Sequence, residues 1–545
     1  MRETALSPRS DKKARLLTAL FFLLLAAIGC LTSFDYGLNF DAMHEQYILK
    51  LNLREYGERL LGKNHPFKPP IFPEPGVNPL PEYFERFHGQ SAYYLATPLL
   101  KLETHARDWM RPAWNMYTFL VFMAGIWAVY ALCRGMGVSR ILSAATSLIL
   151  YLTPRFFAEG HYNTKDITVL SLILLTLWLG QRFLYKPGLL RGLLFSLLGA
   201  MATNTRIVGA FAWGLVGVAA VMLVTARKAW TPRLALTALA TALSFVGFFI
   251  LLTPASWPDI PGHLRHIIQN SLHYGAWEGK VLYQGHLYDP YTTPLPPGYI
   301  PHLILLTLPL YTLPLMLAGQ TAAILEITHA RTAFFRDERK LLLAVATLLW
   351  AAPLAYAALG QPVVYNSWRH FYFVYAGIIL MAGSGISRIE SLLNGHKTLR
   401  RLAGCALALC LALSAVGIAL NHPYQYGYYN LLAPRPLEND YELDYWEVST
   451  VNALGKLYSL RDSLLHPAIL TGSDPITIGS LRDMMILPRE VRSQIKMTED
   501  GDAPYILYNT TYAAEYSAAY PPYGYHELFR IDSYGNTLCI LYERD

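Results

Sequence analysis

The residues with the clearest capacity for chemistry follow directly after the first apolar stretch of the chain. They are Asp35, Asp41, His44 and Glu45. A carboxylate in this position can act as a general base toward a hydroxyl or amine, or can bind a divalent cation. The alternative interpretation is a solvated loop in which Asp41 caps a helix. We therefore treat the three acids as candidate catalytic residues and His44 as a candidate acceptor-side residue.

A second group of polar residues lies between two apolar stretches, in segment 153–166. Its members are Arg155, Glu159, His161, Asn163, Lys165 and Asp166. Charged side chains are costly at membrane depth, so a cluster of them between apolar stretches indicates a functional site. Capping of the following helix would explain Asp166 alone. We expect this segment to form a short loop on the outer face of a membrane.

Cationic residues occur at two further points that we expect on the same face. Arg369 and His370 precede an apolar stretch, where a guanidinium and backbone N–H groups at a helix start can bind an anionic phosphate. The alternative is that these side chains reach the membrane interface, with Trp368 as an interfacial aromatic residue. Arg206 is a similar single cation after another apolar stretch.

Aromatic residues are concentrated in two segments, His422–Asn430 and Tyr441–Trp446. Aromatic side chains with nearby amides and acids can bind sugars. They can equally pack a domain against a membrane surface, and we favour that role.

The composition is that of a polytopic membrane protein. Of the 545 residues, 53% are hydrophobic and 15% are charged, whereas soluble proteins carry about a quarter charged residues. The formal charge of +7 does not indicate nucleic-acid binding, because the basic residues lie mostly in short loops between apolar stretches. The five cysteines have neither a zinc-ligand spacing nor a disulfide pattern.

Eleven apolar stretches are long enough to be membrane spans. They cover approximately residues 15–32, 113–132, 138–153, 167–184, 189–204, 207–225, 233–253, 301–323, 341–359, 371–387 and 402–420. With eleven spans, the Arg- and Lys-rich loops all fall on one side, which the positive-inside rule makes cytoplasmic. The candidate site residues then fall on the opposite, extracytoplasmic side.

The chain divides into a membrane domain, residues 1–420, and a C-terminal extracytoplasmic domain, residues 421–545. Within the first outer loop, residues 33–112, the mixed apolar and charged run Tyr47–Leu61 predicts an amphipathic helix. In the tail, Ala468–Thr471, Tyr505–Tyr508 and Leu538–Tyr542 read as short strands, and Arg461–Leu465 and Glu490–Ile495 as parts of helices. We therefore expect a small α/β domain outside the membrane.

The chain resembles the GT-C membrane glycosyltransferases, in particular the bacterial family-39-like branch related to protein O-mannosyltransferases and aminoarabinose transferases. The resemblance covers most of the membrane part. It rests on Asp41–Glu45, Thr153–Asp166, Thr205–Arg206, Trp368–His370, and the aromatic runs His422–Asn430 and Asp444–Trp446. In the family two acids usually follow one another directly, whereas here Ala42 follows Asp41 and the glutamate comes at position 45.

The resemblance implies a GT-C fold and transfer of a sugar from a polyprenyl-phosphate carrier to an extracytoplasmic acceptor, generally with inversion. It implies Asp41, rather than Asp35, as the base and Asp166 as the acid of the second outer loop. The donor phosphate would be bound by Lys165, Arg369 and His370.

Arg206 and Arg155 are further candidate phosphate ligands, and His161 and Asn163 are further candidate acceptor-side residues. The partners are then membrane lipids, the lipid-linked donor and a glycan, lipid or protein acceptor, at the inner membrane of a bacterium with the site facing the periplasm. Metal dependence stays open, with Asp41 and Asp166 as candidate ligands of Mg²⁺ or Mn²⁺.

Two other functions remain open on the sequence. One is a transporter or flippase for a lipid-linked sugar, although the charged residues gather at one face and no internal repeat is evident. The other is an oligosaccharide polymerase or ligase that uses a diphosphate-linked glycan. Phosphate loops of the GxxxxGK[ST] type, HExxH and GxSxG motifs are absent from the sequence, so ATP-driven transport and zinc or serine hydrolysis have no support.

Overall fold

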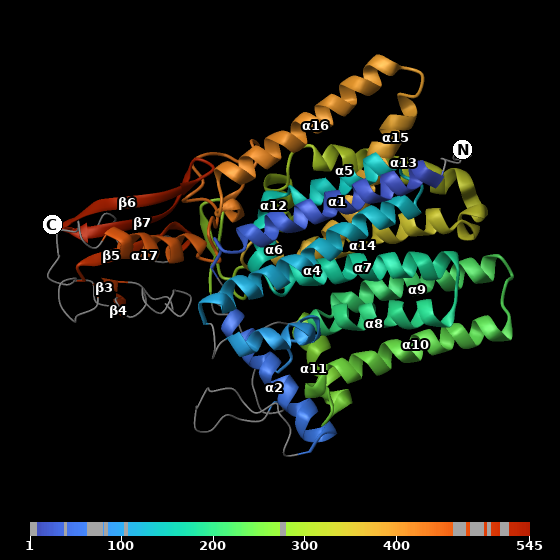
Figure 1. Cartoon of the computed structure of the whole chain (residues 1–545), viewed down its shortest axis with the longest axis horizontal. Coiled ribbons are helices and arrows are strands. Elements are labelled where there is room, and N and C mark those ends of the chain that lie inside the picture. Colours follow the sequence, from blue (N-terminus) through green and yellow to red (C-terminus); the bar gives the residue numbers. More distant parts are fainter. Residues whose placement is uncertain are drawn as a thin grey trace.

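The computed structural model describes residues 8–37, 41–62, 80, 86–102, 107–272, 279–460, 476–479, 495–498, 503–512 and 523–545. The described residues before position 421 are mainly helical, with one short antiparallel hairpin of β1 (Val281–Tyr283) and β2 (His286–Tyr288) (Figure 1). The helices are α1 (Pro8–Thr32), α2 (Ala42–Leu60), α4 (Arg107–Gly135), α5 (Arg140–Tyr151), α6 (Pro154–Tyr162), α7 (Asp166–Tyr185), α8 (Leu189–Thr205), α9 (Val208–Ala226), α10 (Pro232–Leu252), α11 (Ile260–Leu272), α12 (Tyr299–Thr307), α13 (Thr312–Ala330), α14 (Glu338–Gly360), α15 (Tyr375–Leu392) and α16 (Lys397–Leu420).

Within the described residues, eight helices are long and apolar enough to cross a membrane, and the number rises to ten if each of two bent helix pairs is one span. The eight are α1, α4, α7, α9, α10, α14, α15 with the 3₁₀ turn Arg369–Val374 before it, and α16. Each of the eleven predicted stretches corresponds to one of these helices, to a bent pair, or to α8. Since α8 has 17 residues, at the lower limit for a span, the total of eleven stays a prediction.

The two bent pairs show where the apolar stretches change direction. The pair α5 and α6 bends by 69°, and α12 meets the helix starting at Thr312 at 117°. Proline is well suited to such points, because it cannot donate a backbone hydrogen bond inside a helix. Pro154 stands at the first position of α6, and Pro309 lies in the second break. The expectation of a loop over 153–166 was wrong in its first part, because Pro154–Tyr162 forms a fully buried helix.

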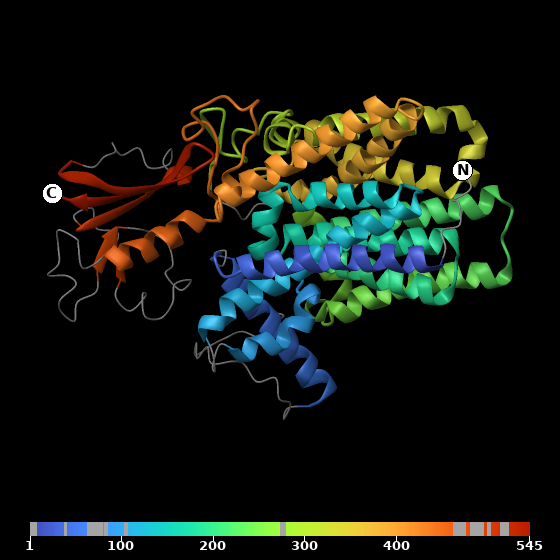
Figure 2. The same ribbon diagram turned by 45° about the horizontal axis from the view of Figure 1, so that its top comes forward.

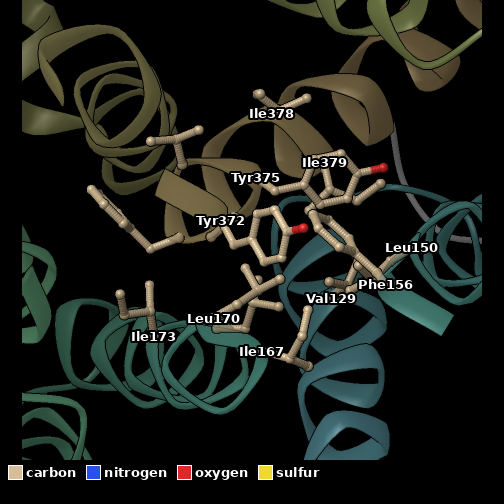
Figure 3. Close-up of a cluster of buried hydrophobic side chains, with 14 of the residues drawn as sticks. Val129, Leu150, Phe156, Ile167, Leu170, Ile173, Tyr372, Tyr375, Ile378 and Ile379 are labelled. Atoms are coloured by element: carbon tan, nitrogen blue, oxygen red, sulfur yellow. The ribbon is translucent and has the colours of Figure 1, made fainter. Parts of the chain in front are cut away.

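Helix α7 lies at the centre of the bundle and packs against α4, α8 and α9. Nearly all of its residues are buried, as expected for a helix that is apolar on every side. Figure 3 shows side chains of α4, α6, α7 and the start of α15 meeting in this core. Phe156 of α6 packs edge-on against the rings of Tyr372 and Tyr375, at centroid distances of 4.7 and 4.8 Å. The core thereby fixes α6 and α7 relative to the start of α15.

The C-terminal region combines helix α17 (Val448–Leu460) with a five-stranded sheet in the order β4-β3-β5-β7-β6. The strands are β3 (Ile476–Gly479), β4 (Ile495–Thr498), β5 (Tyr505–Asn509), β6 (Tyr525–Ser533) and β7 (Asn536–Arg544). β3 pairs in parallel with β4 and β5, and β7 pairs antiparallel with β5 and β6. The predicted strands at Tyr505–Tyr508 and Leu538–Tyr542 are confirmed as parts of β5 and β7.

The remaining tail predictions have a different outcome. The predicted strand Ala468–Thr471 and helix Arg461–Leu465 lie outside the described residues, as does all of Glu490–Ile495 except its last residue. Ile495 itself begins β4.

The sheet and the start of α1 lie at opposite ends of the helical bundle, and the connection between α9 and α10 lies at the α1 end (Figures 1 and 2). Caps at that end explain where several helices begin, since a side-chain oxygen satisfies an otherwise unpaired N–H. Ser139 accepts a hydrogen bond from Leu142 N at the start of α5, Thr231 caps α10 and Asp337 caps α14. The helix predicted over Tyr47–Leu61 is confirmed as part of α2, near the opposite end of the bundle.

Candidate active site

The candidate residues converge because two antiparallel helices end side by side. Helix α7 begins at Asp166, directly after Lys165, and α8 packs against it and ends just before Arg206. The 3₁₀ turn that begins at Arg369 also packs against α7. Residues from three distant parts of the sequence therefore meet at one end of the bundle.

Asp166 lies between two arginines. Its Oδ1 is 2.5 Å from Nη2 of Arg206, and its Oδ2 is 3.5 Å from Nη1 of Arg369. The Asp166 side chain is only 1% exposed, and that of Arg369 is 4% exposed, whereas Arg206 is 27% exposed. A buried carboxylate needs such partners, because an unpaired charge at this depth would be strongly unfavourable. Of the two arginines, Arg206 is the one that solvent and a ligand can reach.

Lys165 contacts both acids contributed by the start of α2. Its Nζ lies 2.9 Å from Oε1 of Glu45 and 3.8 Å from Oδ2 of Asp41. Glu45 is buried, with a side chain that is 2% exposed, whereas Asp41 is 30% exposed. The second carboxylate oxygen of Glu45, Oε2, is buried and has no hydrogen-bond partner in the part of the chain that the structure describes. Lys165 and Asp166 are consecutive, so the two ion-pair groups form one charged cluster of three acids and three cations, which we call the charged cluster.

Asn163 connects the end of α6 to the charged cluster. Its Oδ1 accepts hydrogen bonds from the backbone N–H of Lys165 and Asp166, and its Nδ2 donates to Oδ2 of Asp166 at 3.3 Å. Nδ2 also donates to Oε1 of Glu159 at 3.0 Å, which in turn accepts from Nε1 of Trp446 at 2.8 Å. Asn163 thus has a positioning role in the structure.

Arg369 is enclosed by aromatic rings. Its guanidinium carbon lies 5.0 Å from the ring centroids of Tyr365 and Tyr445 and 5.4 Å from that of Trp446, within the range of cation–π attraction. Nη2 also donates to the Tyr445 hydroxyl at 3.3 Å. His370 packs edge-on against Tyr365 at 4.6 Å. The aromatic run at 445–446, expected to serve in packing, therefore borders the charged cluster.

A strained turn precedes Arg369. Asn366 and Ser367 have φ angles of 55° and 66°, in the left-handed region that non-glycine residues seldom adopt. Arg155 Nη1 donates to the Ser367 hydroxyl at 3.0 Å, and its guanidinium lies over the rings of Tyr426 and Tyr429. These contacts place Arg155 as a support for the turn.

Two other candidates have partners elsewhere. Asp35 is half-exposed, and its Oδ2 lies 2.9 Å from Nε2 of His422. His161 is buried; its Nε2 lies 3.1 Å from the Gly29 carbonyl and its Nδ1 2.9 Å from the Phe157 carbonyl. No described contact joins either residue to the charged cluster.

Sequence reasoning missed His88, which lies near the charged cluster in the first outer loop. The positive charge of Lys165 lowers the pKa of His88 well below its usual value, and burial, Arg206 and His44 lower it further. His44 itself is exposed on α2. The available signal was the adjacent Gly89, which lets the loop approach α8 closely.

We expect the Gly89→Ala substitution to disturb this approach. An added Cβ would lie 1.8 Å from the backbone oxygen of Asn204, whose side chain accepts a hydrogen bond from Ser91 N at 2.9 Å. Because backbone must move, we expect a loss of about 1–3 kcal/mol in unfolding free energy, measured in detergent. The Gly214→Ala variant is the control, since nothing lies within 4 Å of its added Cβ, and it should be neutral or slightly stabilising. Equal stability of the two variants would contradict the close contact.

The buried carboxyl group of Glu45 should make the free energy of unfolding depend on pH. Burial raises its pKa from 4.5 to about 7, although the neighbouring Lys165 acts in the opposite direction. Between these pH values the folded protein retains a proton that the unfolded chain has released. The free energy of unfolding should therefore fall as the pH rises through this interval, by up to about 3 kcal/mol.

The measurement is denaturation in detergent at a series of pH values. The Glu45→Gln variant should lack this component of the fall, and the Glu58→Gln variant, altered at an exposed position of the same helix, should retain it. A Glu45→Gln profile identical to that of the wild type would refute the assignment.

The arrangement does not fit a divalent metal. The described residues contain no group of three or more His, Cys, Asp or Glu side chains placed to hold a metal ion. The carboxylate oxygens of Asp166 face arginines, and the two α2 acids face Lys165. We derive no step through a metal.

No protein-family model and no curated protein matches the chain. Among solved structures, the chain is similar to ArnT from Cupriavidus metallidurans bound to undecaprenyl phosphate, with 12% identity and a TM-score of 0.47 over 96% of this chain and 98% of that chain. It is also similar to the apo state of the same protein, with 13% identity and a TM-score of 0.45 over 97% and 98% of the two chains. Similarity this distant carries no conclusion about activity or ligand.

Proposed function

We propose that this protein is a GT-C-type glycosyltransferase that moves a sugar from a polyprenyl-phosphate-linked donor to an acceptor outside the cytoplasm. The observation that carries the proposal is the charged cluster, in which Lys165, Arg206 and Arg369 meet three carboxylates where membrane helices end. A polyprenyl chain stays in the bilayer, so its phosphate lies at headgroup level. Cations held at a helix end are placed to meet it there.

The reaction that this cluster supports is a direct displacement at the anomeric carbon. The acceptor oxygen or nitrogen forms a bond to C1 of the sugar while the bond between C1 and the phosphate oxygen breaks, and a carboxylate takes the acceptor proton. The electron pair of the broken bond stays on the phosphate, which gains negative charge. Lys165 and Arg206 are partly exposed and stabilise that charge most strongly in the transition state.

Exposure distinguishes the three acids of the charged cluster. Asp41 is 30% exposed, whereas Glu45 and Asp166 are almost fully buried. An acceptor that arrives from water meets Asp41 first, so we assign the general base to Asp41. Attack opposite the leaving phosphate inverts the configuration at C1.

The membrane orientation belongs to the same proposal. The basic loops predict that the α1 end of the bundle is cytoplasmic. The charged cluster and the C-terminal sheet then lie in the periplasm, with the protein in the inner membrane of a bacterium and a cell-envelope glycan, lipid or protein as acceptor.

The test uses the full-length protein in liposomes with undecaprenyl phosphate linked to a radiolabelled hexose or pentose. We expect labelled product together with an equal amount of undecaprenyl phosphate, given an extract of envelope glycans and lipids as acceptor. Movement of intact donor across the bilayer without its cleavage would instead establish a transporter. Turnover confined to diphosphate-linked donors would establish a ligase or polymerase.

A further inference from the structure

Every cation of the charged cluster has a carboxylate partner within the protein itself. Asp166 engages Arg206 at 2.5 Å and Arg369 at 3.5 Å, while Asp41 and Glu45 engage Lys165 at 3.8 and 2.9 Å. The groups proposed to receive a phosphate are thus occupied by anionic side chains of the protein itself. A phosphate that takes over these paired N–H groups must compete with the carboxylates.

The arginines nevertheless keep unused donors. The Nε atoms of both Arg206 and Arg369 are buried and have no hydrogen-bond partner among the described residues. Asp166 meets each guanidinium through one Nη atom, and the other Nη of Arg369 donates to the Tyr445 hydroxyl, so among the described residues it is the Nε of each arginine that stays without a partner. A phosphate has three acceptor oxygens and can use Nε and Nη together, which a single carboxylate shared by two arginines does not.

The charge of the ligand changes during the proposed reaction. A polyprenyl-phosphate sugar is a phosphodiester with one negative charge, whereas the released monoester carries about 1.5 to 2 negative charges at neutral pH. Fixed cations alone would therefore hold the product more tightly than the donor. An anion that returns to the cations would oppose this retention.

We propose that Asp166, with a smaller contribution from Asp41, is a built-in competitor for the phosphate site. Its carboxylate gives up Arg206 when a lipid phosphate binds and returns to it when the phosphate leaves. This inference rests on the proposed function and adds a role for Asp166 in product release.

The test is the affinity of the full-length protein in detergent for undecaprenyl phosphate, measured by isothermal titration calorimetry. The Asp166→Asn variant keeps the size of the side chain and removes the competing charge, so we expect its Kd to fall about tenfold. The Asp41→Asn variant should bind about two- to threefold more tightly, because this partner is more exposed and more distant. The Glu58→Gln variant, on the same helix as Glu45, should bind like the wild type.

Two further probes identify the source of the phosphate. Undecaprenol has the same tail without the phosphate, and its affinity should not respond to either substitution. If the substitutions lower the Kd for undecaprenyl phosphate alone, the site binds the phosphate of a lipid. If they lower the Kd for inorganic phosphate equally, the site binds phosphate irrespective of the tail. Either result supports competition by the carboxylates. Equal tightening for undecaprenol would overturn it.

The two proposals fail differently. A wild-type protein that binds undecaprenyl phosphate no better than undecaprenol would remove the proposed function. A wild type that binds the lipid phosphate, with Asp166→Asn binding equally or more weakly, would remove the competitor alone. If Asp166→Asn does not fold, Asp41→Asn decides, and unchanged or weaker binding by that variant overturns the inference.

Discussion

The Asp41→Asn variant is expected to lose sugar transfer by about a hundredfold or more, the usual scale for removal of a general base, while it still folds and inserts. The asparagine has the same size but cannot take the acceptor proton. Since Asp41 is partly exposed and 3.8 Å from Lys165, its loss should change the unfolding free energy little. The measurements are initial transfer rates with the lipid-phosphate donor and the thermal midpoint in detergent.

The same experiment separates the two candidate bases of the first outer loop. Asp35 pairs with His422 rather than with Lys165, so the Asp35→Asn variant should keep most of the activity. Turnover retained in Asp41→Asn, or lost in Asp35→Asn with the fold intact, would transfer the base assignment to Asp35.

The largest effect on stability is expected for Arg369→Ala. The substitution leaves Asp166 with one partner fewer in a buried setting and removes the guanidinium that the rings of Tyr365, Tyr445 and Trp446 enclose. Breaking a buried ion pair from one side typically costs about 3–5 kcal/mol. Urea or thermal denaturation in detergent should show a loss of this size.

Two companion variants make the interpretation specific. Arg388→Ala, at an exposed position of α15, should change the stability by less than about 0.5 kcal/mol. The double variant Arg369→Ala with Asp166→Asn should be more stable than the sum of the single effects predicts, because the buried carboxylate that lost one of its two partners is gone. Strictly additive effects would show that the two side chains do not interact.

Hydropathy predicted the positions of the apolar helices well, because the length of a span and the cost of burying charge are properties of local sequence. It did not predict their directions. The stretch 301–323 looked continuous, yet the chain turns between α12 and α13. A similar bend follows α5, where a loop was expected and the structure has the buried helix α6. Hydropathy reports the polarity of a segment and not the path of its backbone.

Which candidate residues meet was only partly predictable. Lys165, Asp166, Arg206 and Arg369 could be assigned to one face from the alternation of spans. The partners that hold Asp35, His161 and Arg155 elsewhere are His422, a backbone carbonyl of α1 and Ser367. These partners are distant in sequence, and no local pattern indicates them. For His88 the only local signal was the neighbouring Gly89, which does not by itself indicate a position near the charged cluster.

The enclosure of Arg369 by Tyr445 and Trp446 has a consequence for biogenesis. A chain is synthesised from its N-terminus, so all the cations and acids of the charged cluster are made before the two rings that close over Arg369. Until residue 446 has been synthesised, the rings of Tyr445 and Trp446 cannot enclose this guanidinium. The surroundings of Arg369 are therefore completed only when the C-terminal region has been made, long after the helices that carry the charged cluster.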